Sequence, residues 1–457
     1  MKRFDPHNHT EYSNIRLLDC INKIPNLINR AIELGLSGIA ITDHECLSGH
    51  VKANQYCQKI QEQYPDFKVA LGNEIYLCEN REKGQKYYHF ILIAKNAQGH
   101  KALRELSSVA WLNVFEDRRL ERVITTYEDL ANIVKKYPNS LIAETACLGG
   151  FLSSKILELI NFEESHELDK AYNIKQEINN FIIFNKSLFK DDFYIEVAPG
   201  CSKDQIRANK RLKRIADFYK IKVVIGCDAH YLKKEDRYIH KSYLNSKGGE
   251  REVDTFYEYA YLQSEEEIIQ NLSQSLPDEY ENFAQNSMEI YDKIENYTLF
   301  HKQTIPKIFN FPLVNSLSDN LEDYPILERM NKSLNPYERY WVKECISELK
   351  KKNLYNDIYL KRLEYEADIK STISKKLETN MFAYPVTLQH YIDLFWKSGS
   401  LVGTGRGSSC AGLNHFLLGI THLDPIKWNL PFYRYLNKER VELGSLLLML
   451  PSCKKRL

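Results

Sequence analysis

The sequence lacks a net charge, paired cysteines and long hydrophobic runs, and each absence narrows the classes of protein to which it can belong. Its 62 basic and 61 acidic residues leave a net charge of +1, so any binding of nucleic acid would depend on local patches. The ten cysteines lack the Cys-x-x-Cys spacing of zinc ribbons and redox pairs, which favours a reduced, cytoplasmic setting. No segment approaches the roughly 20 apolar residues of a membrane span, so we expect no membrane partner.

Length and composition indicate a globular protein with more than one folded unit. The chain has 457 residues, more than one ordinary core accommodates, and 43% of them are hydrophobic. A proline-containing stretch in its second half is typical of a linker. We therefore expect a first domain at residues 1–295, a linker at 296–330 and a second region at 331–457.

Short apolar runs alternate with amphipathic stretches over about the first 230 residues, as in βα units. Because these runs carry no dinucleotide-binding glycine fingerprint, they favour an α/β fold with a closed or nearly closed (β/α) barrel of parallel strands. Strands are predicted at residues 38–42, 67–77, 89–95, 140–147, 192–198 and 223–227. Helices are predicted at residues 24–36, 126–136, 155–185 and 203–219, with two more at 264–270 and 279–294.

The second region is predicted to be mostly helical. Amphipathic helices are expected at residues 335–352, 358–376 and 388–398. A glycine-rich loop follows at residues 403–409, and it is neither a Walker loop nor a dinucleotide fingerprint.

One basic run lies in the predicted helix at residues 203–219. A run of this length is usually a solvated helix face, and contact with nucleic acid is the alternative. Its members are Lys210, Arg211, Lys213 and Arg214.

Imidazoles and carboxylates recur where the predicted strands end. Two histidines at positions i and i+2 of an extended segment point to the same side and can bind one ion. The ends of parallel barrel strands open onto one face, so side chains placed there are expected to meet. The residues concerned are His7 and His9, Asp43 and His44, Glu74, and Asp228 and His230.

Each of these residues taken alone is more often a satisfied core or surface residue than a metal ligand. Several strands that all carry metal-binding residue types make the collective interpretation the better one. His89 is the exception to the pattern, because it precedes its predicted strand instead of following it.

Taken in order along the chain, these residues resemble the polymerase-and-histidinol-phosphatase (PHP) domain of bacterial DNA polymerase III alpha subunits. The resemblance also includes a Leu-Leu-Asp that ends at Asp19, an Ala-Cys-Leu-Gly-Gly around Cys147 and an Asp-Ala-His-Tyr from Asp228. Residues 14–16 look inserted relative to the family. In that family nine side chains hold a trinuclear metal site, and the matching positions here are His7, His9, Asp19, His44, Glu74, His89, Cys147, Asp228 and His230.

The resemblance implies a metal-dependent phosphoesterase. Mixed imidazole and carboxylate ligands suit zinc, manganese or iron. Such ions would lower the pKa of a bound water and neutralise the charge of a phosphodiester. Cys147 would bind only as a thiolate, and a small buried core residue is the alternative. The candidate catalytic residues are Asp43, which is expected to orient a ligand or take a proton, His44 and Asp228.

The glycine-rich loop resembles the palm of the same polymerases, together with residues 418–425 and 432–440 that follow it. Backbone amides and an arginine in such a loop would bind nucleotide phosphates, although a simple glycine-rich turn would also explain it. The candidate phosphate-binding residues are Gly405, Arg406, Gly407, Ser408 and Ser409.

The sequence departs from the family after Val441. The family continues into a strand whose aspartates hold the magnesium ions of the polymerase site, whereas residues 442–457 contain no aspartate. We therefore expect an incomplete palm without magnesium or polymerase activity, in a truncated or frame-disrupted gene product or in one part of a split polymerase.

Three functions follow from the resemblance. The leading one is phosphodiester hydrolysis of the 3′-5′ exonuclease type in DNA replication, because no ligand of the family's metal site is missing. DNA, as a single strand or a primer 3′ end, would then be the partner, with other replication proteins or a separate remainder of the polymerase. The alternatives are a metal-binding scaffold without turnover and a phosphatase acting on a small phosphomonoester, which the palm-like segment disfavours.

Overall fold

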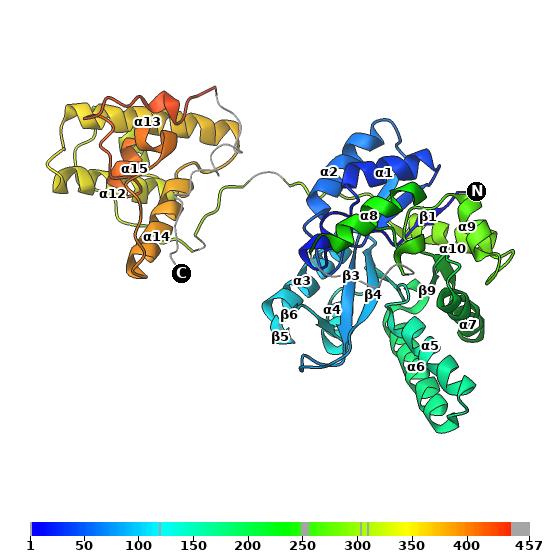
Figure 1. Ribbon diagram of the computed structural model, residues 1–457. Coiled ribbons are helices and arrows are strands. Elements are labelled where there is room, and N and C mark those ends of the chain that lie inside the picture. Colours follow the sequence, from blue (N-terminus) through cyan, green and yellow to red (C-terminus); the bar gives the residue numbers. More distant parts are fainter. Residues whose placement is uncertain (1, 118–119, 248–255, 302–303, 309, 440–457) are drawn as a thin grey trace. The chain divides into compact units, whose positions relative to one another are not determined.

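The computed structural model describes residues 2–117, 120–247, 256–301, 304–308 and 310–439 (Figure 1). The chain forms two compact units, Met1–Phe300 and His301–Leu457, here called the N-terminal and C-terminal units. Residues 296–330, expected as a linker, divide between them, because Tyr297 and Leu299 pack on the first core and helix α11 (Pro325–Asn331) belongs to the second. Within the described residues no helix is both long and apolar enough to cross a membrane.

The N-terminal unit is a nearly closed barrel of mostly parallel strands, as the sequence predicted. The strand order is β1-β2-β3-β4-β8-β9-β10, with β7 beside β3. A parallel bridge between Asn8 and Ala229 brings the chain after β1 next to the chain after β10. The strands are β1 Phe4–Asp5, β2 Gly38–Ile41, β3 Lys68–Cys78, β4 Tyr88–Ala94, β7 Thr125–Thr126, β8 Leu141–Glu144, β9 Phe193–Val197 and β10 Val223–Ile225.

The prediction that all strands run parallel is wrong for β4. This strand is antiparallel to both of its neighbours, β3 and β8. Only 9 residues separate the end of β3 from the start of β4. A connection this short suits an antiparallel pair, whereas a parallel crossover needs a dozen or more residues.

The two-residue periodicity of the strands separates an inner from an outer apolar layer. In β2, Ile39 and Ile41 pack outward against the helices, and Ala40 lies in the inner cluster. Ile142 of β8 and Val224 of β10 also belong to that inner cluster. Both faces of the sheet are therefore buried, which is why the strands read as nearly continuous apolar runs.

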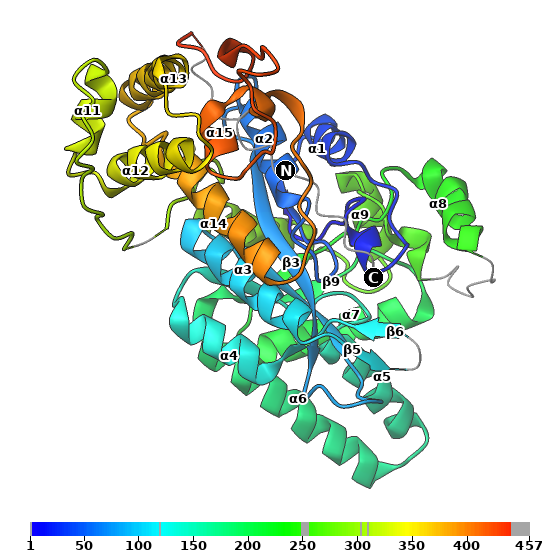
Figure 2. The same cartoon turned by 90° about the vertical axis from the view of Figure 1, so that its left-hand side faces the viewer.

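Helices cover the outside of the barrel (Figures 1 and 2). Helices α3 and α4 pack side by side, with α3 against β3 and β4. The predicted helix at 155–185 is wrong as a single element, because the chain breaks at His166, whose φ of 58° ends one helix before the next begins. The helices are α1 Ile24–Glu33, α2 His50–Gln61, α3 Ala97–Leu112, α4 Tyr127–Lys136, α5 Phe151–Glu164, α6 Leu168–Phe189, α7 Lys203–Tyr219, α8 Arg237–Leu244, α9 Glu265–Leu272 and α10 Tyr280–Lys293.

A separate two-stranded antiparallel sheet lies outside the barrel. It consists of β5 (Phe115–Asp117) and β6 (Leu120–Arg122) and comes directly after α3. No strand was predicted at these positions.

The C-terminal unit is helical in the part that the structure describes. Its core centres on Trp341, Leu363 and Phe382, all fully buried. Helix α14 begins at Ala383, five residues earlier than predicted, because Pro385 falls in the first helical turn, where its missing N–H costs nothing. The remaining helices are α12 Pro336–Lys351, α13 Asp357–Lys376 and α15 Leu413–Leu417.

Candidate metal centre

Most of the predicted ligands lie where the parallel strands end. His7 and His9 follow β1, His44 follows β2, and Asp228 and His230 follow β10. Their side chains are at most 6% exposed, and all five meet at one end of the barrel. This end is the one at which parallel α/β barrels carry their active sites.

His89 joins the centre because β4 is reversed. Its register partner on β3 is Tyr76, two residues after Glu74. The beginning of an antiparallel strand lies beside the ends of its parallel neighbours, so His89 reaches the same face although it precedes its strand. The Nδ1 atom of His89 is 2.9 Å from Oε1 of Glu74.

Glu74 is the central carboxylate, and several imidazoles surround it. Its Oε1 atom is 3.4 Å from Nε2 of His7, and its Oε2 atom is 3.7 Å from Nε2 of His9 and in close contact with Nδ1 of His44. The Sγ atom of Cys147 lies 3.8 Å from Nδ1 of His89 and extends the cluster on that side.

Asp228 and Asp19 hold the other two sides of the centre. The Oδ1 atom of Asp228 is 3.2 Å from Nε2 of His7 and 3.1 Å from Nε2 of His9. The Oδ2 atom of Asp19 is 3.2 Å from Nε2 of His44 and 3.5 Å from Nε2 of His230. All nine predicted ligands therefore lie in one cluster, including Asp19, which follows the residues predicted to be inserted.

Some polar atoms of this cluster hydrogen-bond to one another, as Nε2 of His44 does to Oδ2 of Asp19 at 3.2 Å, but others have no such partner. Among the described residues, both oxygens of Glu74, one oxygen each of Asp19 and Asp228, Nδ1 of His44 and Nε2 of His230 are buried and have no hydrogen-bond partner. Two of these oxygens nevertheless lie close to an imidazole nitrogen: Oδ1 of Asp228 is 3.2 Å from Nε2 of His7, and Oε1 of Glu74 is 2.9 Å from Nδ1 of His89. These polar atoms lie close together but without hydrogen-bond geometry. Metal ligands have this arrangement, because they point toward the ion that they share and not toward one another. An unpaired buried charge is otherwise costly, so the residues fit a multinuclear metal site.

The histidines present a defined nitrogen because their other nitrogen is occupied. Nδ1 of His9 donates to Oγ of Ser13 at 3.0 Å, and Nδ1 of His230 donates to the carbonyl oxygen of Asp228 at 2.8 Å. Nδ1 of His7 donates to the carboxylate of Glu196. Each hydrogen bond fixes the tautomer and leaves Nε2 free to bind an ion.

The carboxylates of the centre are charged. Burial alone would raise the pKa of Glu74, but the His89 and His44 imidazoles hold it well below its usual range. Burial likewise opposes ionisation of Asp19, and His44 and His230 overcome it and lower its pKa. Anionic oxygens that survive full burial are strong ligands for a divalent ion.

Two other ligands keep the neutral form. Burial, followed by the nearby Asp228 carboxylate, raises the pKa of the Cys147 thiol well above its ordinary value. Burial, together with His44 and His230, lowers the pKa of His9 to about 3, so His9 is a neutral imidazole. His9 can bind an ion directly, whereas Cys147 must first lose a proton.

Asp43 does not reach the cluster, because its oxygens are occupied elsewhere. It accepts hydrogen bonds from the backbone N–H of Thr10 at 2.7 Å and from the hydroxyl of Ser13 at 2.7 Å. Since Ser13 in turn accepts from His9, the carboxylate of Asp43 is connected to a ligand through one hydroxyl group.

Sequence reasoning missed the residues that support the ligands. Glu196 on β9 orients His7, Ser13 orients His9, and the Tyr257 hydroxyl donates to Oδ2 of Asp19 at 3.1 Å. Nε2 of His240 on α8 contacts the carbonyl oxygen of Asp19. Glu196 is the one charged residue in the otherwise apolar strand β9. A charged residue at an inward-facing strand position could have indicated its role.

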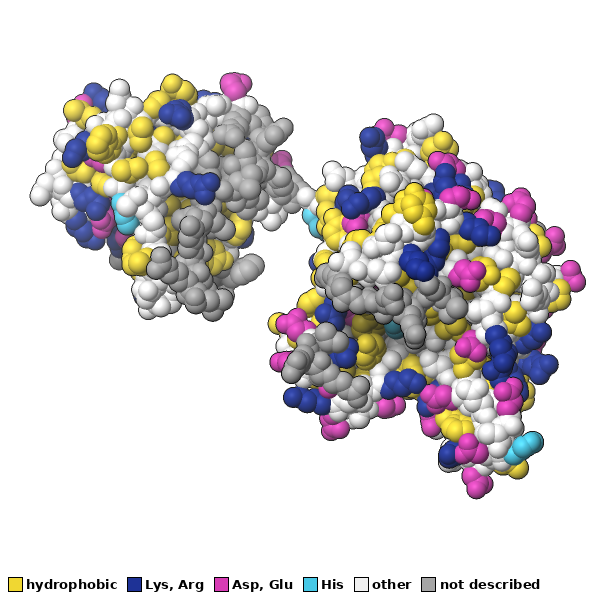
Figure 3. Space-filling view, in the orientation of Figure 1, with side chains coloured by type: hydrophobic (Ala, Val, Ile, Leu, Met, Phe, Trp, Pro, Cys, Tyr) yellow, Lys and Arg dark blue, Asp and Glu magenta, His cyan; other side chains and the backbone are white. Residues whose placement is uncertain are grey.

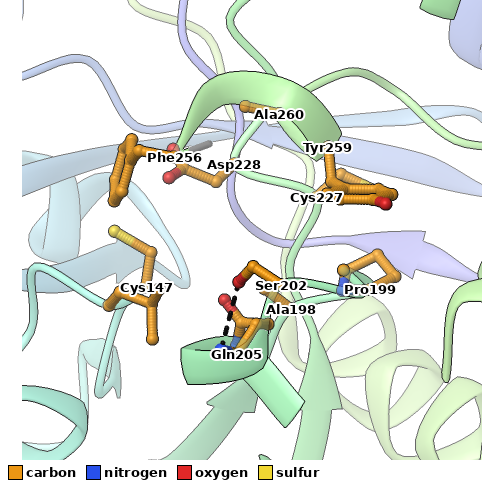
Figure 4. Close-up of a pocket in the computed structure, with 12 residues that line it drawn as sticks. Cys147, Ala198, Pro199, Ser202, Gln205, Cys227, Asp228, Phe256, Tyr259 and Ala260 are labelled. Carbon is orange, nitrogen blue, oxygen red and sulfur yellow. Dashed lines mark hydrogen bonds between the residues drawn. The ribbon is translucent and has the colours of Figure 1, made fainter. Parts of the chain in front are cut away.

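A pocket opens beside the centre (Figure 4). Asp228 and Phe256 lie on one side of it, and Cys147 and Ser202 lie on the other. Ser202 caps α7, its hydroxyl accepting from the backbone N–H of Gln205 at 3.2 Å. A small molecule bound in this pocket would therefore contact two of the candidate metal ligands, Asp228 and Cys147.

The glycine-rich loop has the backbone conformation that its glycines allow. Gly405 and Gly407 have φ angles of 129° and 67°, in the region that favours glycine. Arg406 is exposed, and the Ser409 hydroxyl donates to its carbonyl oxygen at 2.7 Å. Residues 442–457, where the family's aspartates would follow, lie outside the described residues.

The region after the loop is anchored by a buried acid that the sequence did not reveal. Glu366 on α13 accepts hydrogen bonds from the backbone N–H groups of Leu413 and Asn414, at 2.7 and 3.0 Å. These are the first two residues of α15, so the carboxylate caps that helix.

Two protein families match the chain. Residues 5–199 match the PHP domain, and residues 336–445 match the bacterial DNA polymerase III alpha NTPase domain. The chain joins a PHP domain to a segment of the DNA polymerase III alpha family. The resemblance predicted from the sequence is thereby confirmed.

Curated relatives match nearly the whole chain. "Probable DNA polymerase YorL" from Bacillus subtilis (strain 168) is 36% identical over 465 residues, which cover 96% of this chain and 36% of the relative. The DNA polymerase III subunit alpha of Borreliella burgdorferi is 27% identical over 451 residues, which cover 96% of this chain and 34% of the relative. The chain thus spans about a third of the length of these relatives.

Two solved structures resemble part of the chain weakly. One is described as a metal-dependent phosphoesterase from Bifidobacterium adolescentis, with a TM-score of 0.30, and covers 60% of this chain and 97% of that chain. The other is described as an amidohydrolase from Chromobacterium violaceum, with a TM-score of 0.29, and covers 50% of this chain and 87% of that chain. Each is 14% identical, and neither likeness carries weight for function.

Proposed function

We propose that the PHP domain binds a cluster of divalent transition-metal ions and hydrolyses phosphodiester bonds at the 3′ end of single-stranded DNA. The observation that carries this proposal is the cluster of nine ligand-type side chains, five of which have a buried polar atom without a hydrogen-bond partner among the described residues. A domain that binds no metal would not need so many uncompensated polar atoms, because each costs free energy when it is left unpaired.

Different residues of the chain would bind the ions and position the ligands. Divalent ions bound here would activate a water molecule and neutralise the charge of the phosphodiester. His44, Glu74 and Asp228 hold the ions, and Asp43 acts as a positioning residue through Ser13. The adjoining pocket places Phe256 and Ser202 next to Asp228, at the edge of the cluster.

The metals proposed are zinc, manganese or iron, since both imidazole and carboxylate ligands are present. Three groups of side chains have donor atoms within 4.8 Å of one another, which supports a trinuclear arrangement. Their members are His9, His44 and His230; His7, His9 and Glu74; and His44, Glu74 and His89.

For the C-terminal unit we propose weak nucleotide binding by the glycine-rich loop. Arg406 is exposed and lies between two glycines with positive φ angles, and a loop of this kind can present backbone amides to phosphates. The resemblance implies DNA as the partner of the chain, either a single strand or a primer end. Magnesium is not proposed for this chain.

The experiment is a nuclease assay on a single-stranded oligonucleotide with a label at its 5′ end. Metal-supplemented protein should shorten it stepwise from the 3′ end, and chelation should abolish this. His9→Ala should lose at least 100-fold in rate, whereas the control His166→Asn, on an exposed turn far from the cluster in sequence, should not change it.

Two results would overturn the proposal. Metal-loaded protein that leaves DNA intact but releases phosphate from a small phosphomonoester would be a phosphatase. Metal-loaded protein that hydrolyses neither substrate would be a metal-binding scaffold.

A further inference from the structure

A strip of aromatic rings and guanidinium groups leads away from the metal centre. It begins at the His89 ring, on which Tyr76 stacks at 5.1 Å with an interplanar angle of 20°. Tyr87 stacks on Tyr76 at 5.0 Å and 25°. The Arg122 guanidinium lies 5.4 Å from the centre of the Tyr87 ring, and its Nη1 atom donates to the Tyr87 hydroxyl at 3.1 Å.

The strip continues past β6 to a second arginine–aromatic pair. Nη2 of Arg16 donates to the carbonyl oxygen of Glu121, the residue before Arg122. Its guanidinium lies 5.4 Å from the centre of the Trp111 ring, which is 37% exposed at the end of α3. The aromatic–arginine strip is defined here as Tyr76, Tyr87, Arg122, Arg16 and Trp111.

The charges of the two arginines are poorly compensated. Within the described residues, no carboxylate oxygen lies within 4.0 Å of the Arg16 guanidinium, and its buried Nε atom has no hydrogen-bond partner. The nearest carboxylate of Arg122 is Asp117, at 4.0 Å, the outer limit of an ion pair. A half-buried guanidinium with at most a distant counter-ion is suited to binding an anion, and two oxygens of a tetrahedral phosphate match its fork.

Arg16 is one of the three residues that the resemblance predicts to be inserted. It directly follows a short 3-10 helix, Ser13–Ile15, and lies between Ser13, which contacts His9, and Asp19, which contacts His44. It therefore carries a guanidinium to the rim of the centre without displacing Asp19.

We propose that the aromatic–arginine strip binds the single strand of DNA that leads to the metal centre. The two guanidinium groups would contact successive phosphates, and the exposed Trp111 ring would stack on a base. Alternating cations and aromatic faces are the usual means by which proteins hold single strands without reading their sequence. This inference rests on the proposed function, since it places the substrate of the same site.

The basic run on α7 is a weaker candidate for this role. Arg211 pairs with Glu163 at 2.5 Å, and Lys213 pairs with Asp217 and Glu279 at 2.8 and 3.2 Å. These pairs neutralise much of the run, as expected for a solvated helix face. Figure 3 likewise shows acidic and basic side chains interspersed over the face of the N-terminal unit that it presents.

The test measures the affinity of the full chain for a fluorescent oligothymidylate that a phosphorothioate linkage at its 3′ end protects from hydrolysis. Arg16→Gln and Arg122→Gln should each weaken binding about three- to tenfold and lower the slope of log affinity against log salt by about 0.7. Arg214→Gln on α7, an exposed arginine, is the matched control and should change neither.

A second measurement separates binding from chemistry. Hydrolysis of bis(4-nitrophenyl) phosphate, which is too small to reach the strip, should stay within twofold in all three variants. Arg16→Lys and Arg122→Lys should recover part of the DNA affinity, because they keep the charge but lose the fork.

Each outcome decides one of the two proposals. The proposal that the strip binds DNA would be overturned if folded Arg16→Gln and Arg122→Gln kept their DNA affinity. It would also be overturned if Arg214→Gln lost as much affinity as they do. Loss of small-substrate hydrolysis together with DNA affinity would also overturn it, because the arginines would then support the centre itself. Failure of the wild-type protein to hydrolyse either substrate, with strip-dependent DNA affinity intact, would overturn the proposed function alone.

Discussion

Both carboxylate oxygens of Glu196 face Nδ1 of His7, at 2.9 and 3.1 Å, inside the barrel. Glu196 is buried, and its backbone N–H donates to the Thr145 hydroxyl oxygen at 3.0 Å. This pair makes His7 a ligand with a fixed ring plane and a free Nε2 atom. Carboxylates in this position also increase the basicity of the imidazole that they hold.

Replacement of Glu196 by glutamine should therefore weaken metal binding about 10- to 100-fold. The amide keeps the size of the side chain but carries no charge. Isothermal titration of metal-stripped protein measures the affinity. The matched control is Glu144→Gln on the neighbouring strand β8, since Glu144 is equally buried but makes no hydrogen bond to a ligand among the described residues. Equal losses in the two variants would contradict the role given to Glu196.

Metal content provides the second prediction. Nine ligands exceed what one four- to six-coordinate ion can use, so metal-supplemented protein should hold more than one ion per chain. Asp228→Asn should lower that number and the melting temperature, because a bound ion at 100 times its Kd contributes about 2.7 kcal/mol to folding. Asparagine is chosen because residue 228 has a φ of 48°, which asparagine tolerates. Elemental analysis that finds one ion or none would contradict the prediction.

The sequence identified the candidate ligands of the centre, but it did not predict how the fold brings all of them together. Strand-end positions identified His44 and Asp228, because apolar runs that end in polar residues mark the open face of a barrel. They could not explain His89, since strand direction depends on the short connection from β3 and on pairing with β8. Glu196 and Glu366 were missed because a buried acid is recognisable only when its partners, distant in sequence, are known.

The third prediction concerns the glycine-rich loop. A Cβ atom at Gly405 would lie 2.9 Å from Sγ of Cys410 and 3.1 Å from Cβ of Thr421, and the φ of 129° is itself unfavourable for other residues. Gly405→Ala should therefore destabilise the C-terminal unit by roughly 1–3 kcal/mol. Gly403→Ala is the control, because its Cβ would meet nothing within 4 Å. Chemical denaturation followed by tryptophan fluorescence measures both variants, and equal midpoints would show that the loop relaxes around the methyl group.

The last prediction depends on a buried lysine in the same unit. Lys370 on α13 is fully buried, and its Nζ atom has no hydrogen-bond partner among the described residues. Burial lowers its pKa to about 8, although Glu366 and Cys345 act in the opposite direction. The groups packed around it also include His415, whose pKa burial lowers to about 3 with a further contribution from Lys370, and the Tyr435 ring at 6.0 Å from Nζ.

The pH dependence of stability follows from that shift. Between pH 8 and pH 10.5, the ordinary pKa of lysine, the unfolded chain binds more protons than the folded chain, so stability gains from Lys370 as the pH rises. Below about pH 8 the folded protein bears the full cost of a buried charge. Lys370→Met should remove this pH dependence. The change in the free energy of unfolding that it causes should be more favourable at pH 7 than at pH 10.5, by on the order of 2–3 kcal/mol. Lys375→Met, an exposed lysine on the same helix, is the control and should leave the pH profile of the wild type unchanged. Urea denaturation from pH 6.5 to 10.5 measures all three proteins, and parallel profiles for wild type and Lys370→Met would show that a counter-charge or water compensates the ammonium group in the folded state.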